Sequence, residues 1–397
     1  MSVRAVEDSA VPFRSLFAAA CAAFLVVISG VGSASAQTEF NTTAPFALLM
    51  DYESGTILYQ KDADARMEPA SMAKLMTVAV VLDLIRDGAL SLEDEFFISE
   101  NAWRTGGAAS GGSTMFAELN SRISVDDLLH SVIIQSGNDA SIALAEGIAG
   151  TEATFANIMN ELSAEIGLNS SHWTNASGLP DPDMYTSARD LANLGRYIIR
   201  EFPDYYENFS IAEMTWNGIT QPNRNGLLEM GIGVDGLKTG HTNAAGYGMV
   251  ASTTDGGRRL IAVVHGTQSA SERTSETRNL LNWGVRGFER IAAYPAGATV
   301  GHARIYGGET AEVPLVGEGS IDLYVPRGSR RCLSAQIVYE APIRPPVAAG
   351  QRLAELHVLC DDQIIQSAPL YAGQAVGEGD LVRRATDALF ELALGWI

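Results

Sequence analysis

The chain has 397 residues, a length that suits two or three domains of ordinary size. Hydrophobic residues make up 46% and charged residues 19%, a globular balance that argues against disordered, collagen-like and solenoid proteins. The formal net charge of -20 argues against nucleic acid as a partner, because so acidic a surface repels phosphate backbones.

The N-terminal segment 1–36 is predicted to be a secretory signal. Arg4 and Arg14 lie in its basic region, an apolar run covers 16–32, and 34–36 reads Ala-Ser-Ala, a small-residue cleavage site. The alternative is a transmembrane anchor, but the run is short and weakly apolar, which favours cleavage. Export would allow one disulfide between Cys332 and Cys360, although two buried thiols fit the sequence equally well.

Residues 37–292 are predicted to form an α/β (α+β layered) domain. Short apolar runs flank turns at 53–55 and 255–257, which indicates two β-hairpins. Helical patterns lie between and after them, at 69–86, from Ser124, and at 138–149, 152–166, 187–200 and 274–290. A strand, a helix-rich segment and further strands in this order place the first and last strands in one sheet.

The pattern changes at about residue 293. Strand-like runs punctuated by Gly and Pro predict a small all-β domain over 293–376; they occur at 303–306, 311–315, 320–325, 333–340, 353–360 and 363–370. The tail 377–397 has the pattern of an amphipathic helix, with Leu381, Leu389 and Trp396 on one face. Such a helix can lie in a membrane interface. The alternatives are docking on its own domain or oligomerisation.

Lysine is rare in this sequence. Of the 27 basic residues only Lys61, Lys74 and Lys238 are lysines. Arginine cannot be deprotonated in a protein, so a retained lysine raises the question of whether a removable proton is needed at that position. The alternative is a compositional bias that left three lysines in place.

Ser71 and Lys74 form the first chemical motif. A spacing of three residues is nearly one helical turn, so the hydroxyl and the amine share a face. Ser71 also follows Pro69 in the first helical turn, where free backbone N–H groups can stabilise an oxyanion. A neutral lysine can take the serine proton if burial or a nearby cation lowers its pKa.

Two further motifs follow along the chain. The first, 136–138, places the Ser136 hydroxyl and the Asn138 amide on one turn, where they can relay a proton and hold a substrate. The second, 238–240, directly precedes a predicted strand. There Lys238 would supply the cation that keeps Lys74 neutral and orients Ser136, and Thr239 could bind a carboxylate. Gly240 would let substrate approach the backbone, where the N–H of residue 241 would be a second oxyanion donor.

Each motif alone is weak, but the three in order resemble those of penicillin-binding proteins and serine β-lactamases. More narrowly, the chain resembles the low-molecular-mass penicillin-binding proteins, the serine-type D-alanyl-D-alanine carboxypeptidases of peptidase family S11. Four further segments match that family's pattern, namely 172–179, 186–190, 223–225 and 235–242. The resemblance covers nearly the whole mature chain, including the β domain and the tail.

The resemblance implies a function and a site. The expected reaction removes the terminal D-alanine from peptidoglycan stem pentapeptides, needs no metal or cofactor, and is inhibited by β-lactams. The expected location is the periplasmic side of the cytoplasmic membrane, attached peripherally through 381–397. The residues to which the family's catalytic and substrate-binding roles carry over are Ser71, Lys74, Ser136, Asn138 and Lys238 for catalysis and Thr239, Gly240, His241 and Arg273 for substrate.

Two other functions are open at this point. Residues 165–169 read Glu-Ile-Gly-Leu-Asn, which resembles the deacylating glutamate segment of class A β-lactamases. The flanking run 172–179 and the second β domain argue instead for a carboxypeptidase. A non-catalytic wall-binding or shape-determining scaffold could have lost Ser71 or Lys74, yet both are present.

Overall fold

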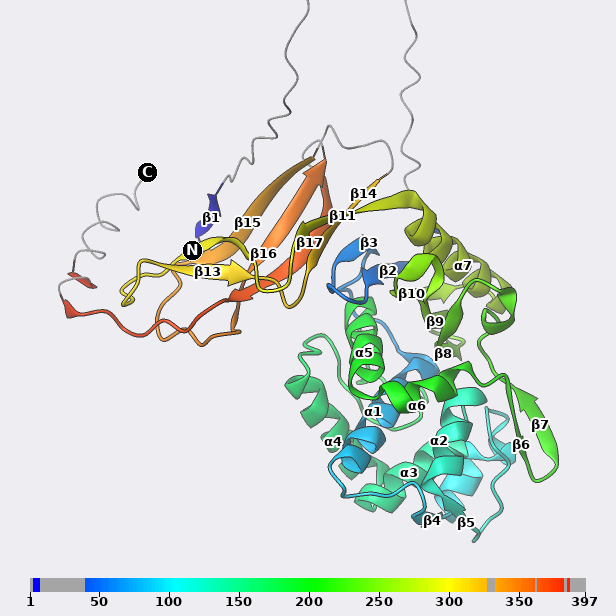
Figure 1. The fold of residues 1–397 in the computed structure, drawn as a ribbon. Coiled ribbons are helices and arrows are strands. Elements are labelled where there is room, and N and C mark those ends of the chain that lie inside the picture. The colour runs from blue at the N-terminus through cyan, green and yellow to red at the C-terminus, as the bar shows by residue number, and fades with distance from the viewer. Residues whose placement is uncertain (1–2, 8–39, 327–332, 361–362, 382–383, 386–397) are drawn as a thin grey trace, which may run out of the picture. The chain divides into compact units, whose positions relative to one another are not determined.

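The computed structural model describes residues 3–7, 40–326, 333–360, 363–381 and 384–385 (Figure 1). Most of the predicted signal segment, Cys332 and most of the predicted tail helix lie outside these residues. The chain divides into two compact units. The larger unit comprises Phe40–Tyr52 and Ile57–Arg286, and the β unit contains the chain from Gly287 onward.

The larger unit is built on an antiparallel sheet of strand order β3-β2-β10-β9-β8. The strands are β2 (Phe46–Asp51), β3 (Ile57–Lys61), β8 (Val234–Thr242), β9 (Gly246–Thr253) and β10 (Leu260–Thr267). The predicted union of the first and last strands is confirmed, because Val263 of β10 lies opposite Leu48 of β2. The α/β fold class is thereby confirmed as well.

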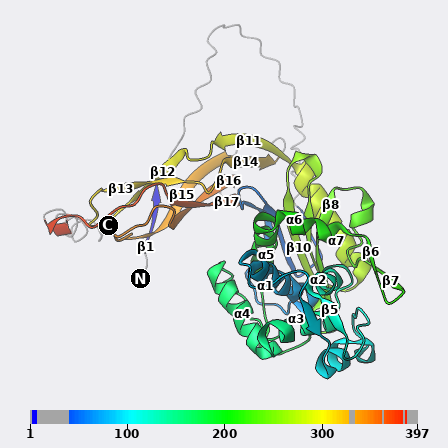
Figure 2. The same cartoon turned by 60° about the horizontal axis from the view of Figure 1, so that its bottom comes forward.

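Helices cover both faces of this sheet. On one face Gly195 of α5 (Ala188–Glu201) packs on Leu237 and Val250. On the other, Gly284 of α7 (Ala270–Gly287) packs on Leu49. The remaining helices, α1 (Lys74–Arg86), α2 (Val125–Ile134), α3 (Asn138–Ala149), α4 (Glu152–Glu165) and the short α6 (Pro203–Tyr206), complete the unit (Figure 2).

The starts of these helices follow from local chemistry. Ser124, Thr151 and Ser187 each precede a helix and accept a hydrogen bond from a backbone N–H three residues on, as good N-cap residues do. Helix α1 is buried continuously from Lys74 to Leu82 and contacts α2, α3, α4 and α5. It is therefore the central helix of the unit, and it begins at the predicted lysine.

Three sequence expectations need correction. The predicted helix 69–86 opens with a separate 3-10 turn, η1 (Ala70–Ala73), because Ala70 has a left-handed φ of 48° that an α-helix does not allow. The helix predicted over 274–290 spans Ala270–Gly287 and gives way to strand β11 (Phe288–Tyr294), which pairs with β14 (Ile321–Pro326). Residues 238–240 lie within strand β8 rather than before a strand.

Short strand pairs were also missed, because three- or four-residue strands carry little periodicity. They are β4 (Glu95–Phe97) with β5 (Arg122–Ser124), and β6 (Glu213–Trp216) with β7 (Ile219–Pro222). The second pair contacts the segment before α2, where Gln221 Nε2 donates to the carbonyl of Thr114 over 2.9 Å.

The β unit has an antiparallel sheet of order β1-β15-β16-β17-β13-β12 and a separate β11–β14 ribbon. Its sheet strands are β1 (Val3–Glu7), β12 (Thr299–Arg304), β13 (Glu312–Val316), β15 (Leu333–Ala341), β16 (Arg352–Cys360) and β17 (Gln363–Ala372). Gln366 of β17 joins the two by accepting from the N–H of Tyr324 and donating to the carbonyl of Asp322. The all-β character predicted from residue 293 is confirmed.

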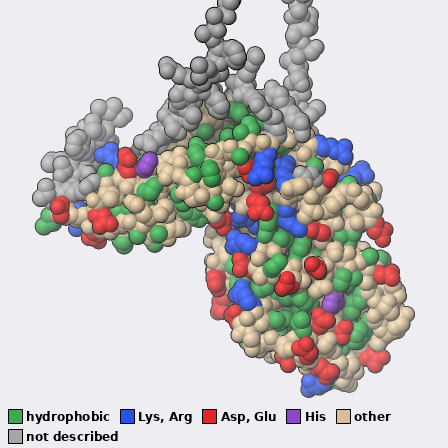
Figure 3. Space-filling view, in the orientation of Figure 1, with side chains coloured by type: hydrophobic (Ala, Val, Ile, Leu, Met, Phe, Trp, Pro, Cys, Tyr) green, Lys and Arg blue, Asp and Glu red, His purple; other side chains and the backbone are tan. Residues whose placement is uncertain are grey.

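Figure 3 shows acidic side chains dispersed over the visible face of the larger unit, with apolar and basic groups between them. Within the described part of the chain, no helix combines the length and the apolar character needed to cross a membrane.

Candidate active site

The site begins at the turn that carries Ser71. Backbone hydrogen bonds in both directions join Met67 to Thr186 and fix the chain just before the turn. Pro69 and the left-handed Ala70 then reverse the chain into η1, which contains Ser71, and α1 follows directly with Lys74. Three residues along this helical path bring the serine and the lysine together, with Lys74 Nζ 3.1 Å from Ser71 Oγ.

Lys74 is fully buried and has two further oxygen partners. Its Nζ lies 2.7 Å from Oδ1 of Asn138 and 2.5 Å from the carbonyl oxygen of Ser177. A neutral amine has two hydrogens and one lone pair. If both hydrogens are given to these carbonyl oxygens, which can only accept, the lone pair is left for the hydroxyl proton of Ser71.

The electrostatics favour that neutral state near neutral pH. Burial lowers the pKa of Lys74 to about 7, with the carboxylates of Asp139 and Glu152 acting in the opposite direction. Burial also lowers the pKa of Lys238 well below its ordinary value, and repulsion from Lys74 adds to the effect. The two lysines therefore lie in one buried region, but burial, and not the expected cation of Lys238, is what lowers the pKa of Lys74.

The second motif lies on the turn that enters α3. Ser136 has a left-handed φ of 67°, and its buried Oγ has no hydrogen-bond partner. Asn138, the first residue of α3, bonds to Lys74 as described. Next to it, the fully buried carboxylate of Asp139 accepts from Thr114 Oγ1 at 2.6 Å and from the N–H of Met115 at 2.9 Å. Asp139 thus anchors the 114–117 loop beside the motif.

The third motif runs along β8 against η1. A Cβ on Gly240 would lie 3.0 Å from the carbonyl oxygen of Pro69 and 3.2 Å from Cβ of Ala70. A side chain here would have to push the strand and the Ser71 turn apart by a few tenths of an ångström, so glycine suits this close approach. Lys238 and Thr239 are both buried here, with 2% and 6% exposure.

The far end of the motif gathers an aromatic pair and more positive charge. The ring of His241 stacks on Tyr247 with centroids 3.8 Å apart. Arg273 of α7 is only 9% exposed, and its Nε has no hydrogen-bond partner. Arg224 and Arg273 both act on Lys238, so a chain of net charge -20 concentrates cations at this end of the site. Such a cluster suits an anionic ligand group.

The structure brings the predicted site residues into one region, with one predicted contact absent. Ser136 Oγ has no partner, so the expected orientation of Ser136 by a Lys238 hydrogen bond is not seen; Lys238 Nζ instead donates to the carbonyl of Thr239 over 3.3 Å. Sequence reasoning missed the carbonyl of Ser177, because a backbone group has no sequence signature. Glu165, the glutamate of the β-lactamase-like segment 165–169, is exposed at the C-terminal end of α4. The carboxylate of α4 that acts on Lys74 is Glu152, at the opposite end of that helix.

Gly178 provides a test of how tightly the site is packed. It has a left-handed φ of 73°, and a Cβ would lie 1.9 Å from the carbonyl oxygen of Ala70, the residue before Ser71. We expect Gly178→Ala to lower the free energy of unfolding by about 2 kcal/mol or more and to slow acylation.

The matched control for Gly178 is Gly167→Ala. Gly167 has a φ of 78° but open space around the position of a Cβ. This change should cost only the backbone strain, about 1 kcal/mol, and leave acylation unchanged. Urea unfolding and penicillin acylation of both variants check the prediction, and equal behaviour of the two would contradict it.

His265 of β10 provides a test of stability against pH. It is 1% exposed, and burial lowers its pKa to about 4, opposed by a hydrogen bond with the backbone of Glu68. An unfolded histidine titrates near 6.5, so below that pH the unfolded chain binds the extra proton and stability falls until about pH 4. Between pH 7 and pH 5 the loss should be about 2 kcal/mol. Urea unfolding should show a smaller pH dependence in His265→Met, and an unchanged one would refute the assignment.

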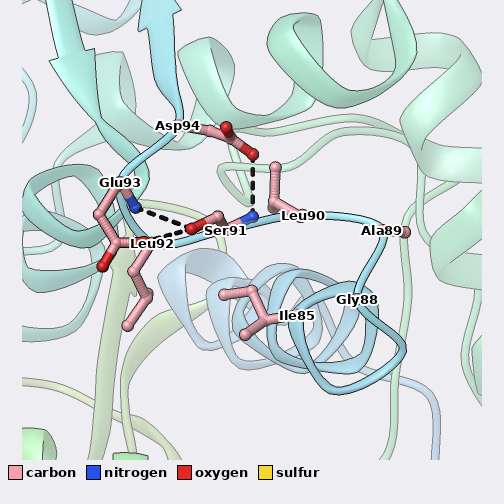
Figure 4. Close-up of a pocket in the computed structure, with 8 residues that line it drawn as sticks. All are labelled: Ile85, Gly88, Ala89, Leu90, Ser91, Leu92, Glu93 and Asp94. Carbon is pink, nitrogen blue, oxygen red and sulfur yellow. Dashed lines mark hydrogen bonds between the residues drawn. The ribbon is translucent and has the colours of Figure 1, made fainter.

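A separate pocket lies at the other end of α1. It is lined by Ile85 and residues 88–94, and the N–H of Ser91 donates to Asp94 over 2.9 Å (Figure 4). Lys74 and Ile85 are eleven residues apart on one helix, roughly 16 Å along its axis. This pocket is therefore distinct from the Ser71 region.

Comparison with known proteins gives the same identification. Residues 33–269 match the family described as D-alanyl-D-alanine carboxypeptidase, and residues 288–378 match the C-terminal domain of penicillin-binding protein 5. The carboxypeptidase DacD of Escherichia coli is 38% identical over 86% of this chain and 88% of its own. DacA of Haemophilus influenzae is 37% identical over 92% of this chain and 94% of its own.

Solved structures agree with the sequence comparison. Penicillin-binding protein 5 from Haemophilus influenzae superposes with a TM-score of 0.69 at 40% identity, covering 86% of this chain and 99% of that one. Penicillin-binding protein D2 from Listeria monocytogenes, in its ampicillin-bound form, gives 0.54 at 28% identity over 62% of this chain and 98% of its own. With its serine and buried lysine in contact and a second buried lysine on strand β8, the chain belongs to the S11 family of serine-type D-alanyl-D-alanine carboxypeptidases, the low-molecular-mass penicillin-binding proteins.

Proposed function

We propose that Ser71 is the nucleophile of the carboxypeptidase reaction and that neutral Lys74 is its base. The observation that carries this proposal is the set of three oxygens around Lys74 Nζ, two of which can only accept hydrogens. As Ser71 Oγ attacks the carbonyl carbon of the penultimate D-alanine, its proton passes to Lys74. The developing oxyanion is held by the backbone N–H groups of Ser71 and His241.

The second half of the reaction releases both products. The bond from the acyl carbon to the nitrogen of the terminal D-alanine breaks, and that nitrogen takes a proton from the site. Water then hydrolyses the ester on Ser71. Ser136 lies two residues from Asn138, which contacts Lys74, and its hydroxyl has no hydrogen-bond partner. It is therefore suited to relay the proton from Lys74 to the leaving amine.

The substrate's terminal carboxylate is assigned to the cationic end of the site. Lys238 and Arg273 supply nitrogen donors, Thr239 supplies a hydroxyl, and Gly240 lets strand β8 lie close to the Ser71 turn. His241 and Tyr247 form the wall next to it. The same arrangement fits the carboxylate of a penicillin, which would acylate Ser71 in place of the peptide.

The pH dependence of acylation tests the assignment of the base. Burial lowers the pKa of Lys74 to about 7, and only the neutral amine can take the serine proton. The rate of acylation by a penicillin should therefore rise about tenfold per pH unit below pH 7 and level off above it. Stopped-flow measurement between about pH 5 and pH 9 checks this. A rate that falls as pH rises would refute Lys74 as base.

The domain boundaries and the attachment are proposed from the sequence. We assign 1–36 to a cleaved signal, 37–292 to the peptidase domain, 293–376 to the β domain and 377–397 to a helix that lies on the periplasmic face of the cytoplasmic membrane. Because cleavage would remove β1 (Val3–Glu7), the sheet of the mature β domain would begin at β15. Leu381 is 81% exposed, which suits the start of an apolar docking face. Truncation before 381 should release the enzyme from sedimented membranes with its peptidase activity intact, and continued sedimentation would contradict the attachment.

A further inference from the structure

The geometry of Lys74 depends on a segment far away in the chain. The carbonyl of Ser177, 103 residues from Lys74, is one of the two carbonyl acceptors of its Nζ. If that carbonyl moved, one amine hydrogen would lose its acceptor and the lone pair would no longer be directed at Ser71. Whatever fixes the peptide unit between Ser177 and Gly178 therefore also fixes the orientation of the base.

Thr77 contacts the adjoining peptide unit directly. It lies one turn beyond Lys74 on α1 and is fully buried. Its Oγ1 donates to the carbonyl of Ala176 over 2.7 Å. A buried helical threonine commonly bonds to the carbonyl four residues back in its own helix, as Thr277 does with Arg273 in α7. Thr77 instead directs its hydroxyl out of α1 to the segment that contacts Lys74.

One carboxylate, of Glu152, and one carboxamide, of Asn175, hold the backbone N–H groups of residues 176–178. Oε2 of Glu152, in the first turn of α4, accepts from the N–H of Ala176 at 3.3 Å. Oδ1 of Asn175 accepts from the N–H of Ser177 at 3.2 Å and of Gly178 at 2.8 Å. The N–H side of Ala176 is thus attached to α4 and its carbonyl side to α1, with Thr77 on the helix that also carries Lys74.

We propose that Thr77 is a positioning residue for the reaction: by holding the carbonyl of Ala176, it sets the next carbonyl, that of Ser177, on the amine of Lys74. Thr77 touches neither substrate nor Ser71 and acts through the backbone of 176–177. The inference rests on the proposed role of Lys74 as base. It adds a functional residue one turn beyond Lys74: Ser71 of η1 is followed at intervals of three residues by Lys74 and Thr77 of α1.

The test compares Thr77→Val with Thr77→Ser. Valine keeps the shape and removes the donor, whereas serine keeps the donor. Acylation by a chromogenic penicillin is followed on the alkaline plateau, where Lys74 is neutral. Thr77→Val should lower the maximal acylation rate about 10- to 100-fold with an unchanged half-saturating concentration, because a misplacement of about 1 Å at a reacting group costs up to about 100-fold. Thr77→Ser should stay within about threefold of the parent.

The matched control is Thr253→Val. Thr253 is equally buried, and its Oγ1 donates to the carbonyl of Ile232 over 2.6 Å, at the end of β9 away from the motif on β8. Its loss should lower thermal stability without slowing acylation. If Thr77 had only a structural role, Thr77→Val would behave in the same way, and that result would overturn the proposal.

Three further variants keep the test decisive. If Thr77→Val does not fold, Glu152→Met removes the other anchor of Ala176 and must slow acylation on the plateau, with Glu152→Gln, which keeps an oxygen acceptor, closer to the parent. A parental rate in Glu152→Met would then overturn the proposal.

Lys74→Arg separates the role of Lys74 as base from the role of Thr77 as positioning residue. An active Lys74→Arg enzyme refutes Lys74 as base. An inactive Lys74→Arg enzyme together with a fully active Thr77→Val enzyme refutes only the role of Thr77.

Discussion

Replacing Ser71 with alanine is expected to reduce hydrolysis of peptides ending in D-Ala-D-Ala by about 10⁴-fold or more. The change removes the only atom proposed to form the acyl-enzyme, so no rate can be recovered by adding substrate. The fold should persist, because Ser71 is half-buried and contributes one hydrogen bond, with Lys74, worth about 1 kcal/mol. The release of D-alanine measures the loss of hydrolysis, and circular dichroism of the variant shows whether the fold persists.

The control for Ser71→Ala is Ser121→Ala. Ser121 is half-buried, as Ser71 is, and its hydroxyl donates to the carbonyl of Glu118 in the turn before β5. This variant should hydrolyse the peptide and take up a fluorescent penicillin as the parent does. Turnover by Ser71→Ala above about 1% of the parental rate would assign the nucleophile to another residue.

Replacing Lys74 with arginine should lower the acylation rate by about 10³-fold or more. Arginine keeps a positive charge at the site, but it is not deprotonated in proteins and so cannot take the serine proton. Loss of activity in this variant would thus come from the missing lone pair and not from missing charge. The rate of penicillin acylation is the appropriate measurement, since it does not depend on deacylation.

The chain offers a matched control in Lys61→Arg. Lys61 of β3 donates to the carbonyl of Thr42 over 2.9 Å, a contact that a guanidinium can also make. Acylation in this variant should stay within about twofold of the parent. If Lys74→Arg is acylated within about tenfold of the parental rate, the proton of Ser71 is accepted elsewhere.

The local part of this site could be predicted from the sequence, because it depends on neighbouring residues. The spacing of Ser71 and Lys74 on a helical path, the caps at Ser124 and Ser187 and the hairpin of β2 and β3 follow from short-range rules. The resemblance to a known family then placed Asn138 and Lys238 in the same region.

The remainder depends on contacts between distant residues. Ser177 acts through its carbonyl, and Thr77 acts on another carbonyl 99 residues away, so neither side chain signals its place. The left-handed conformations of Ala70 and Ser136 were not predicted either, since non-glycine residues rarely adopt them without tertiary support. The strand β11 lies where a helical pattern runs on, because pairing with β14 overrides local propensity after Gly287.

The central claim, an acyl-enzyme on Ser71, is tested most directly by mass spectrometry of the intact enzyme after penicillin treatment, followed by tryptic mapping. Cleavage after Arg66 and Lys74 yields the peptide 67–74, Met-Glu-Pro-Ala-Ser-Met-Ala-Lys, in which Ser71 is the only hydroxyl residue. The account predicts one penicillin adduct per chain, carried by this peptide and absent from Ser71→Ala. An adduct on a different peptide, or an equal adduct in Ser71→Ala, would contradict it.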